Sequence, residues 1–231
     1  MERIKFNGID IFVEEAENFI QINDIQGDDL LRIWEPLTTQ YPGFEVTLCF
    51  RDMTVPTAAL DSIGAVVLED CISMKVTPPE FKPHPSHEIE LLEMADFDEF
   101  AALHDKLNPD TSDMYWTSRR MRDKWDIWRV LVLKIDGKIT GYSMIMVSQN
   151  GGTQGEIFCV EADTVDHRKA LVSATVDCAF NVGNKLVLNM VDRDNTRDYD
   201  VSLAVGFRET GFYVGYIHYP QKEILTDMPS E

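Results

Sequence analysis

Four prolines fall within the ten residues Thr77–Ser86. Proline has no amide hydrogen to donate and its ring fixes the backbone angle φ, so neither a helix nor a central strand can run through such a segment. The segment therefore predicts a break in the fold. We expect residues 1–80 and residues 87–231 to form separate domains, joined by a proline-rich linker at residues 81–86.

The charge of the chain limits the ligands it can attract. Its 231 residues include 21 lysines and arginines against 40 aspartates and glutamates, a net charge of −19. The acidic excess is spread over both predicted domains and repels phosphate backbones and anionic lipids, so we expect no nucleic-acid and no membrane partner. A cationic ligand is favoured, although acidity that serves solubility alone would look the same.

The chain has no apolar run of about 18 residues, and its first residues lack the apolar stretch of a signal peptide. Its cysteines form no C-x-x-C pair and lie in apolar stretches, which is typical of reduced core residues in a cytoplasmic protein. They are Cys49, Cys71, Cys159 and Cys178. His84 and His87 stand three residues apart in the proline-rich segment. One such spacing is a weak metal signal, so we expect no metal.

Residues 87–219 contain alternating strand-like and helix-like stretches. The dipeptide Asp136-Gly137 between two strand-like runs is a strong signal for a two-residue hairpin, and Thr117 is a plausible helix N-cap. The order is β-α-α-β-β-β-α-β-α-β. The expected elements are strand 87–94, helix 96–107, a helix from 117, strands 128–135, 138–147 and 156–161, helix 168–182, strand 185–191, helix 195–205 and strand 208–219.

This order resembles the GNAT superfamily of acyl-CoA-dependent N-acyltransferases. The most specific part is Asn195–Phe207, similar to the family's Asn-x-x-Ala-x-x-x-Tyr-x-x-x-Gly-Phe segment in register at Asn195, Gly206 and Phe207. The resemblance implies a mixed α/β (α+β) fold, with a mostly antiparallel central sheet flanked by helices. It also implies an enzyme that moves an acetyl group from acetyl-CoA to a primary amine.

The cofactor site that the resemblance implies lies at the start of a helix. Unpaired amides and the positive dipole end of a helix can hold a pyrophosphate, and Arg168 and Lys169 add cations there. The family's two loop glycines fall on Ala170 and Val172, and the same two cations would also suit a solvated first turn. The candidate cofactor-binding residues are Val160, Asp166, His167, Arg168, Lys169, Ala170, Leu171, Val172 and Asn195.

The chemical step needs a polarised thioester and a base. The resemblance places a free strand amide at Val160, where it would bind the thioester carbonyl. We take Glu156 as the candidate base; Glu161 would point to the opposite face unless a bulge intervenes. The family's tyrosine acid falls on Ser202, which is less acidic, and Tyr199 could replace it only if its helix turns it inward.

Residues 1–80 resemble the second half of a GNAT domain preceded by a hairpin in residues 3–23. Helix 28–37, strand 44–50, helix 54–63, Gly64 and strand 65–76 repeat the order of residues 168–219, although any αβαβ stretch would look similar. Asp24, Asp28 and Asp29 would repel a pyrophosphate, so we expect this smaller α/β half-domain to have no cofactor site. Covering the second domain, shaping an acceptor cleft and pairing two subunits as a homodimer are the roles open to it.

Two functions follow. The first is an N-acetyltransferase that acts on an amine of a small-molecule or peptide acceptor. The acidic charge of the chain favours a cationic acceptor. The acceptor wall of this enzyme would include Trp116, Trp125 and Trp128, although we expect at least two of them to serve packing. The second is a non-catalytic, degenerate GNAT-fold protein that binds an acyl-CoA or a partner as a regulator or scaffold. Ser202, Ala170 and Val172 favour it.

Overall fold

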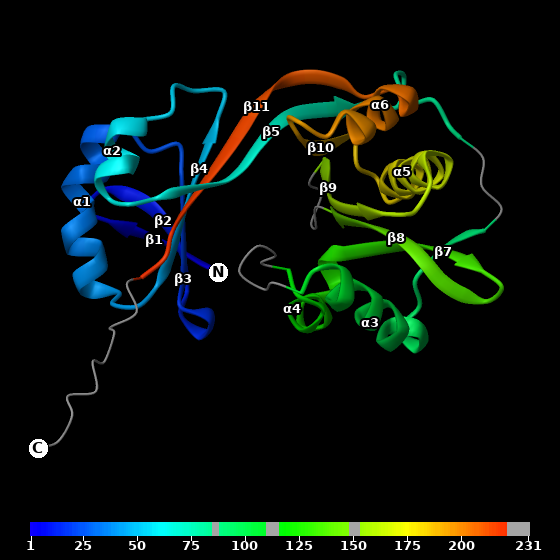
Figure 1. Ribbon diagram of the computed structural model, residues 1–231, viewed down its shortest axis with the longest axis horizontal. Coiled ribbons are helices and arrows are strands. Elements are labelled where there is room, and N and C mark those ends of the chain that lie inside the picture. Colours follow the sequence, from blue (N-terminus) through cyan, green and yellow to red (C-terminus); the bar gives the residue numbers. More distant parts are fainter. Residues whose placement is uncertain (85–87, 110–115, 148–152, 221–231) are drawn as a thin grey trace, which may run out of the picture. The chain divides into compact units, whose positions relative to one another are not determined.

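The computed structural model describes residues 1–84, 88–109, 116–147 and 153–220, and its chain divides into two compact units (Figure 1). Unit 1 consists of Met1–Asp70 and Phe212–Glu231, whereas unit 2 consists of Cys71–Gly211. This division differs from the predicted one, because residues 71–80 belong to the second unit and residues 212–220 belong to the first. Each unit is a mixed α+β structure whose mostly antiparallel sheet carries helices.

Unit 1 contains a mostly antiparallel sheet. Its strands lie in the order β1 (Glu2–Phe6), β2 (Ile9–Glu14), β3 (Phe19–Asn23), β4 (Glu45–Arg51), the later part of β11 (Arg208–His218) and the first part, Val66–Asp70, of β5 (Val66–Val76). β3 and β4 are parallel, and α1 (Gly27–Gln40) connects them. A short 3-10 helix, η1 (Glu15–Glu17), precedes β3, and α2 (Thr57–Ser62) follows β4.

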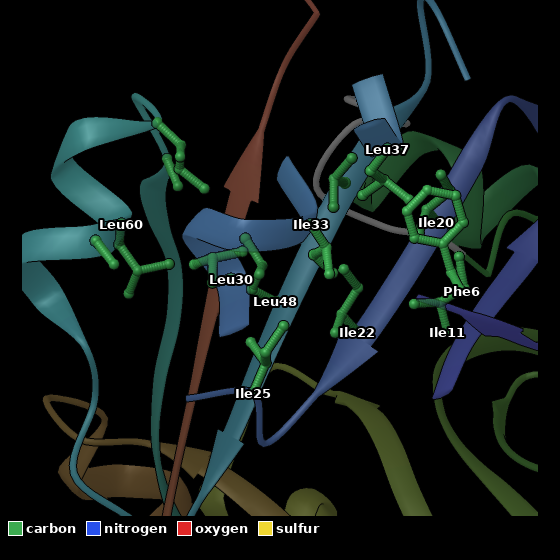
Figure 2. Close-up of a cluster of buried hydrophobic side chains, with 14 of the residues drawn as sticks. Phe6, Ile11, Ile20, Ile22, Ile25, Leu30, Ile33, Leu37, Leu48 and Leu60 are labelled. Atoms are coloured by element: carbon green, nitrogen blue, oxygen red, sulfur yellow. The ribbon is translucent and has the colours of Figure 1, made fainter. Parts of the chain in front are cut away.

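The core of unit 1 lies between its two helices and one face of this sheet (Figure 2). Leu30, Ile33 and Leu37 recur at the spacing of one helix face, and all three are fully buried. They meet the alternate strand residues Ile22 and Leu48. The predicted helix 28–37 and strand 44–50 are therefore α1 and β4.

Unit 2 also contains a sheet. Its strands lie in the order Arg208–Gly211 of β11, Cys71–Val76 of β5, β10 (Leu186–Asp192), β9 (Gln154–Glu161), β8 (Lys138–Val147), β7 (Trp128–Ile135) and β6 (Ile89–Leu91). One face carries α3 (Phe97–Leu107) and α4 (Ser118–Asp123), and the other carries α5 (Val165–Asn181) and α6 (Thr196–Val205) (Figure 1). The 3-10 helices η2 (Met94–Asp96) and η3 (Trp125–Ile127) complete it.

The two halves of the sequence exchange their last strands. In the first half, β3, α1, β4 and α2 lead to β5, and in the second half, β9, α5, β10 and α6 lead to β11. The end of β5 pairs with β10, antiparallel, from Cys71 to Val76. The end of β11 pairs with β4, also antiparallel, from Tyr213 to His218. Each unit is thus completed by a strand from the other half of the chain.

The proline-rich segment packs on unit 2 through residue 84. Its non-proline amides find acceptors: Lys82 N–H donates to Val205 O at 2.8 Å, and His84 N–H donates to Ser173 Oγ at 2.8 Å. The Phe81 and Phe180 rings meet edge to face. The described part of the predicted linker is therefore an ordered part of unit 2. Residues 85–87, including His87, lie outside the described residues.

Several local signals in the sequence are confirmed. Asp136 and Gly137 both have positive φ, as the predicted tight hairpin requires. Thr117 caps α4 by accepting the N–H of Arg120. Gly206 ends α6 with a φ of 104°, and Phe207 N–H reaches back to Ser202 O. No helix among the described residues is long and apolar enough to span a bilayer.

A buried polar network fastens α3 to the sheet of unit 2. His104 on α3 is 1% exposed, and its Nε2 lies 3.1 Å from the Trp116 carbonyl, which can only accept. Nε2 therefore carries the hydrogen, and Nδ1 accepts from the Tyr142 hydroxyl at 2.8 Å. Asn108 Nδ2 also donates to that hydroxyl. The network needs a neutral His104, and burial lowers the pKa of this imidazole.

We expect Gly206→Ala to lower the free energy of unfolding by about 2–5 kcal/mol, because left-handed strain and overpacking add. An added Cβ would lie 2.1 Å from the Glu80 carbonyl oxygen. Gly183→Ala is the matched control: Gly183 has a φ of +100° and open space around its Cβ position. It should cost only about 1–2 kcal/mol. Urea unfolding measures both, and equal losses would contradict the contact with Glu80.

His104 gives a prediction for pH. The unfolded chain takes up a proton at His104 near pH 6.5, whereas the folded chain, with its lowered His104 pKa, takes it up only at a lower pH. Stability should be complete above that pH and should fall below it, by up to about 1.4 kcal/mol per pH unit. His104→Gln should remove this part of the slope between about pH 7.5 and 5.5 in urea unfolding. Identical slopes in the two proteins would refute it.

Candidate functional site

The parallel strands β9 and β10 separate before β9 ends. Their register pairs Gln154–Ile157 with Leu186–Asn189, whereas β9 continues beside β8 as far as Glu161 opposite Tyr142. The last four residues of β9 therefore have an edge that the β10 register does not cover. The resemblance places the thioester carbonyl beside this edge.

A β-bulge at Phe158 changes the direction of side chains along β9. Met144 lies opposite Cys159 and Ile145 lies opposite Ile157, so Phe158 is the extra residue. The bulge brings Glu156, opposite Met146, and Glu161, opposite Tyr142, to the same face of the sheet. Since these neighbours on β8 are four residues apart, the two glutamates are ~13 Å apart along the strand.

Arg168, the predicted phosphate-binding cation, lies against the edge of β9 that β10 does not cover. Its Nη1 donates to Val160 O at 2.5 Å, and its Nε donates to Ala162 O at 3.1 Å. The N–H of Val160 lies on the same edge as its carbonyl, because both groups of a strand residue point to one side. The Val160 and Ala162 carbonyls on this edge are therefore already bonded to Arg168.

Two carboxylates complete the environment of Arg168. Nη1 lies 3.0 Å from Asp198 Oδ2, and Nη2 lies 3.1 Å from Glu161 Oε2. The Arg168 residue is only 5% exposed. Because its donors already bind two carbonyls and two carboxylates, the geometry does not support Arg168 as a ligand for an external phosphate. We call Arg168, Glu161, Asp198 and the Val160 and Ala162 carbonyls the arginine cluster.

The N-terminus of α5 has a side-chain cap. The helix begins at Val165, three residues before the predicted start, and Thr164 is its N-cap. Thr164 Oγ1 accepts the N–H of His167, and Thr164 O accepts the N–H of Arg168. Two of the amides expected to hold a pyrophosphate are therefore bonded inside the protein.

The other predicted cofactor residues on α5 divide between core and surface. Ala170, Leu171 and Val172 are buried in the core, so the positions of the family's glycines do not face an approaching ligand. Lys169 is partly exposed, and its Nζ lies 3.8 Å from an Asp166 carboxylate that is 93% exposed. Asp166 adds negative charge where the cofactor needs positive charge.

The start of α6 positions Asp198 for the arginine cluster. Asn195, predicted to bind the cofactor, is the N-cap: its Oδ1 accepts the N–H of Asp198, and its Nδ2 donates to Asp198 Oδ2 at 2.9 Å. Ser202 is fully buried; its hydroxyl donates to Asp198 O and accepts from Asn189 Nδ2. Neither side chain is disposed to act on a ligand.

The remaining proton donors are also engaged. The Tyr199 hydroxyl donates to Glu209 on β11, and this hydrogen bond raises the Tyr199 pKa. Cys159 lies beside Tyr142 and Glu161, and burial raises the pKa of its thiol to about 12. A thiolate nucleophile is therefore not present at neutral pH.

The tryptophans of the predicted acceptor wall pack within the α3 face. Trp128 is fully buried, and Trp116 meets it edge-on with ring centres 5.1 Å apart. Trp125 packs on Phe97 at 5.3 Å. The exposed Phe158 also stacks edge-on against Trp128. These contacts give the three tryptophans a packing role.

Sequence reasoning missed Thr164 and Asp198. Thr164 stands two residues before an acidic residue in a helix's first turn, which is an N-cap signal that could have been used. Asp198 gave no comparable signal, because its partner Arg168 lies 30 residues away. Glu161 was considered only as a base, and it serves here as a counter-ion of Arg168.

Comparison with known proteins shows which solved structures share this fold. No protein-family model matches the chain, and no curated protein matches its sequence. A functionally unknown protein from Staphylococcus epidermidis ATCC 12228 superposes with a TM-score of 0.70 at 10% identity, covering 95% of this chain and 94% of that one. A putative GNAT-family acetyltransferase from Novosphingobium aromaticivorans DSM 12444 gives 0.60 at 12% identity, with 88% and 84% covered.

A tandem GNAT protein from the clavulanic acid biosynthesis pathway gives a TM-score of 0.59 at 11% identity and covers 96% of this chain and 79% of its own. Sequence identities this low establish a shared fold and nothing more. The chain therefore has the fold of the GNAT N-acetyltransferases, the architecture on which those proteins are built.

Proposed function

We propose that this chain is a non-catalytic GNAT-fold protein that works as a scaffold or regulator through its folded surface. The single observation that carries the proposal is the buried guanidinium of Arg168 on the edge of β9. That edge is where the resemblance puts an acyl-CoA thioester. A guanidinium held against the Val160 carbonyl competes with a thioester chain for this edge.

The residues present do not fit coenzyme A. At the thioester end, Arg168 occupies Val160 O and Ala162 O. At the diphosphate end, Thr164 takes up two amides of α5, and the exposed Asp166 carboxylate repels an anion. The one predicted cation left near this helix start, Lys169, lies beside Asp166. We therefore derive no chemical step through this cofactor.

The proton-transfer groups support the same proposal. The candidate acids of the sequence, Ser202 and Tyr199, both donate their hydroxyl hydrogen to groups of the protein. Ser202 is also fully buried. A reaction that depends on returning a proton to a departing thiolate has no donor among these candidates.

The second candidate function is the N-acetyltransferase. It would move an acetyl group from acetyl-CoA to the primary amine of a cationic small molecule or peptide. The bulge at Phe158 and the early end of the β9–β10 register favour it, because they leave the Val160 N–H on an uncovered edge. The bulge also puts Glu156 on the same face as Glu161, where a base would be needed. Acyl transfer would require Arg168 to leave this edge.

We expect calorimetric titration of the full chain with acetyl-CoA to give no binding tighter than about 1 mM. Release of free thiol across a panel of primary amines, including polyamines and lysine peptides, should stay at the rate of a protein-free control. Lys169→Ala is the matched variant, because it removes this partly exposed cation and leaves the arginine cluster intact. Saturable binding by the wild type that Lys169→Ala weakens would overturn the proposal in favour of the acetyltransferase.

A further inference from the structure

The strand β6 lies at one end of the strand order, and β7 is its only neighbour among the strands that the structure describes. Leu92 N–H donates to Val130 O of β7 at 2.8 Å, and Glu88 O accepts a hydrogen bond from β7 at 3.0 Å. Backbone groups of successive strand residues point to opposite sides, so those of Ile89 and Leu91 point away from β7. The N–H and C=O groups of these two residues form the β6 edge, which is open to a further strand.

The side chains along the β6 edge are apolar on one face of the sheet. Ile89 and Leu91 lie opposite Leu133 and Leu131, on the face that carries α5. Leu91 is 48% exposed, although its neighbour Leu131 is buried. An apolar surface therefore continues from the core of unit 2 to the open edge.

The other face of β6 is acidic. Glu90 points to the face that carries α3, because strand side chains alternate and Glu90 lies opposite Val132. Its side chain is 56% exposed, and its Oε1 lies 2.5 Å from Lys134 Nζ. The same Nζ lies 2.8 Å from Asp96 Oδ2, so one cation serves two carboxylates. A basic residue on an added strand would balance the remaining negative charge.

A second copy of this chain does not match the β6 edge. Two β6 strands paired antiparallel about Glu90 would place this carboxylate opposite its own copy, and like charges there are destabilising. The strand at the other end of the order, β1, carries Arg3 and Lys5. The residues that flank its two-residue turn bond to each other, so Arg3 and Lys5 have their backbone groups on the outer side. Pairing with β6 would put these cations opposite its apolar residues.

We propose that the β6 edge binds an extended segment of a partner protein in which a basic residue stands between two apolar residues. The segment adds to the sheet as a further strand, with its basic side chain opposite Glu90 and its apolar side chains opposite Ile89 and Leu91. Backbone hydrogen bonds to both apolar residues hold it. The inference rests on the proposed function, because it names the surface and the class of partner through which a non-catalytic scaffold acts.

The probe is the blocked peptide acetyl-Thr-Val-Arg-Val-Thr-amide, which has no primary amine, so its binding does not depend on acyl transfer. In an NMR titration of the full chain it should bind with a Kd of about 1 mM or tighter. Amide shifts should be centred on Ile89 and Leu91, and hydrogen exchange should slow at these two amides. The same peptide with glutamate in place of arginine should bind about three- to tenfold more weakly, because Glu90 then faces a like charge.

N-methylation of the peptide separates strand addition from loose apolar contact. In the added strand the two valine amides face β6, whereas the arginine amide faces away. Methylating both valine amides should weaken binding at least about tenfold, because two hydrogen bonds are lost. Methylating the arginine amide should weaken it less than about threefold.

Matched variants test the same register from the side of the protein. Leu91→Pro removes an N–H that points away from β7, so the bonds between β6 and β7 remain. It should weaken peptide binding at least about tenfold, whereas Leu91→Val, which keeps the amide, should stay within about threefold of wild type. Glu90→Lys should reverse the preference between the arginine and glutamate peptides.

The outcomes separate this inference from the proposed function. No saturable binding by the wild type, shifts centred away from β6, or equal losses with the two methylation patterns would overturn the inference. Equal binding of the arginine and glutamate peptides would overturn it as well. The titration with acetyl-CoA decides the proposed function separately, because the peptide probe is not an acyl acceptor. If Leu91→Pro does not fold by circular dichroism, the two methylated peptides decide the inference on the wild type.

Discussion

A buried guanidinium holds the end of β9, the first turn of α5 and the start of α6 together. Arg168 binds Val160 O, Ala162 O, Glu161 and Asp198 from a residue that is 5% exposed. A buried charge is tolerated only when its hydrogen bonds and counter-ions are complete, and losing one partner of such a pair costs about 3–5 kcal/mol. The geometry of this corner of unit 2 is therefore fixed by one side chain.

The exchange of β5 and β11 sets a second constraint, this time on folding. Each unit obtains an antiparallel strand from the half of the sequence that otherwise builds the other unit. The sheet of unit 1 is incomplete until Tyr213–His218 is in place, near the end of the described chain. Bringing together residues so far apart in sequence costs loop-closure entropy, and such non-local pairing slows folding. The internal repeat in the sequence therefore predicts the order of helices and strands along the chain. It does not predict which strands pair with one another.

Features that depend on a few neighbouring residues could be predicted from the sequence. Asp136-Gly137, Thr117 and Gly206 each fix a backbone conformation locally, so the hairpin, the cap and the end of α6 were found at those residues. The bulge at Phe158 and the partners of β5 could not be, because they depend on strands distant in sequence. The proline-rich segment predicted a break between elements; its packing through Phe81 and Lys82 depends on α5 and α6.

Arg168 shows why a local charge pattern is a weak guide to a site. Two adjacent cations in an acidic chain resemble a phosphate-binding site. The sequence does not reveal which of the protein's own anions the fold brings near them. Here the protein supplies the anions itself: Glu161 comes from the strand before the helix, and Asp198 comes from 30 residues later. In a chain with a net charge of −19, an internal carboxylate is the more available counter-ion for a buried arginine. An external diphosphate would have to displace both carboxylates and also cross the field of Asp166.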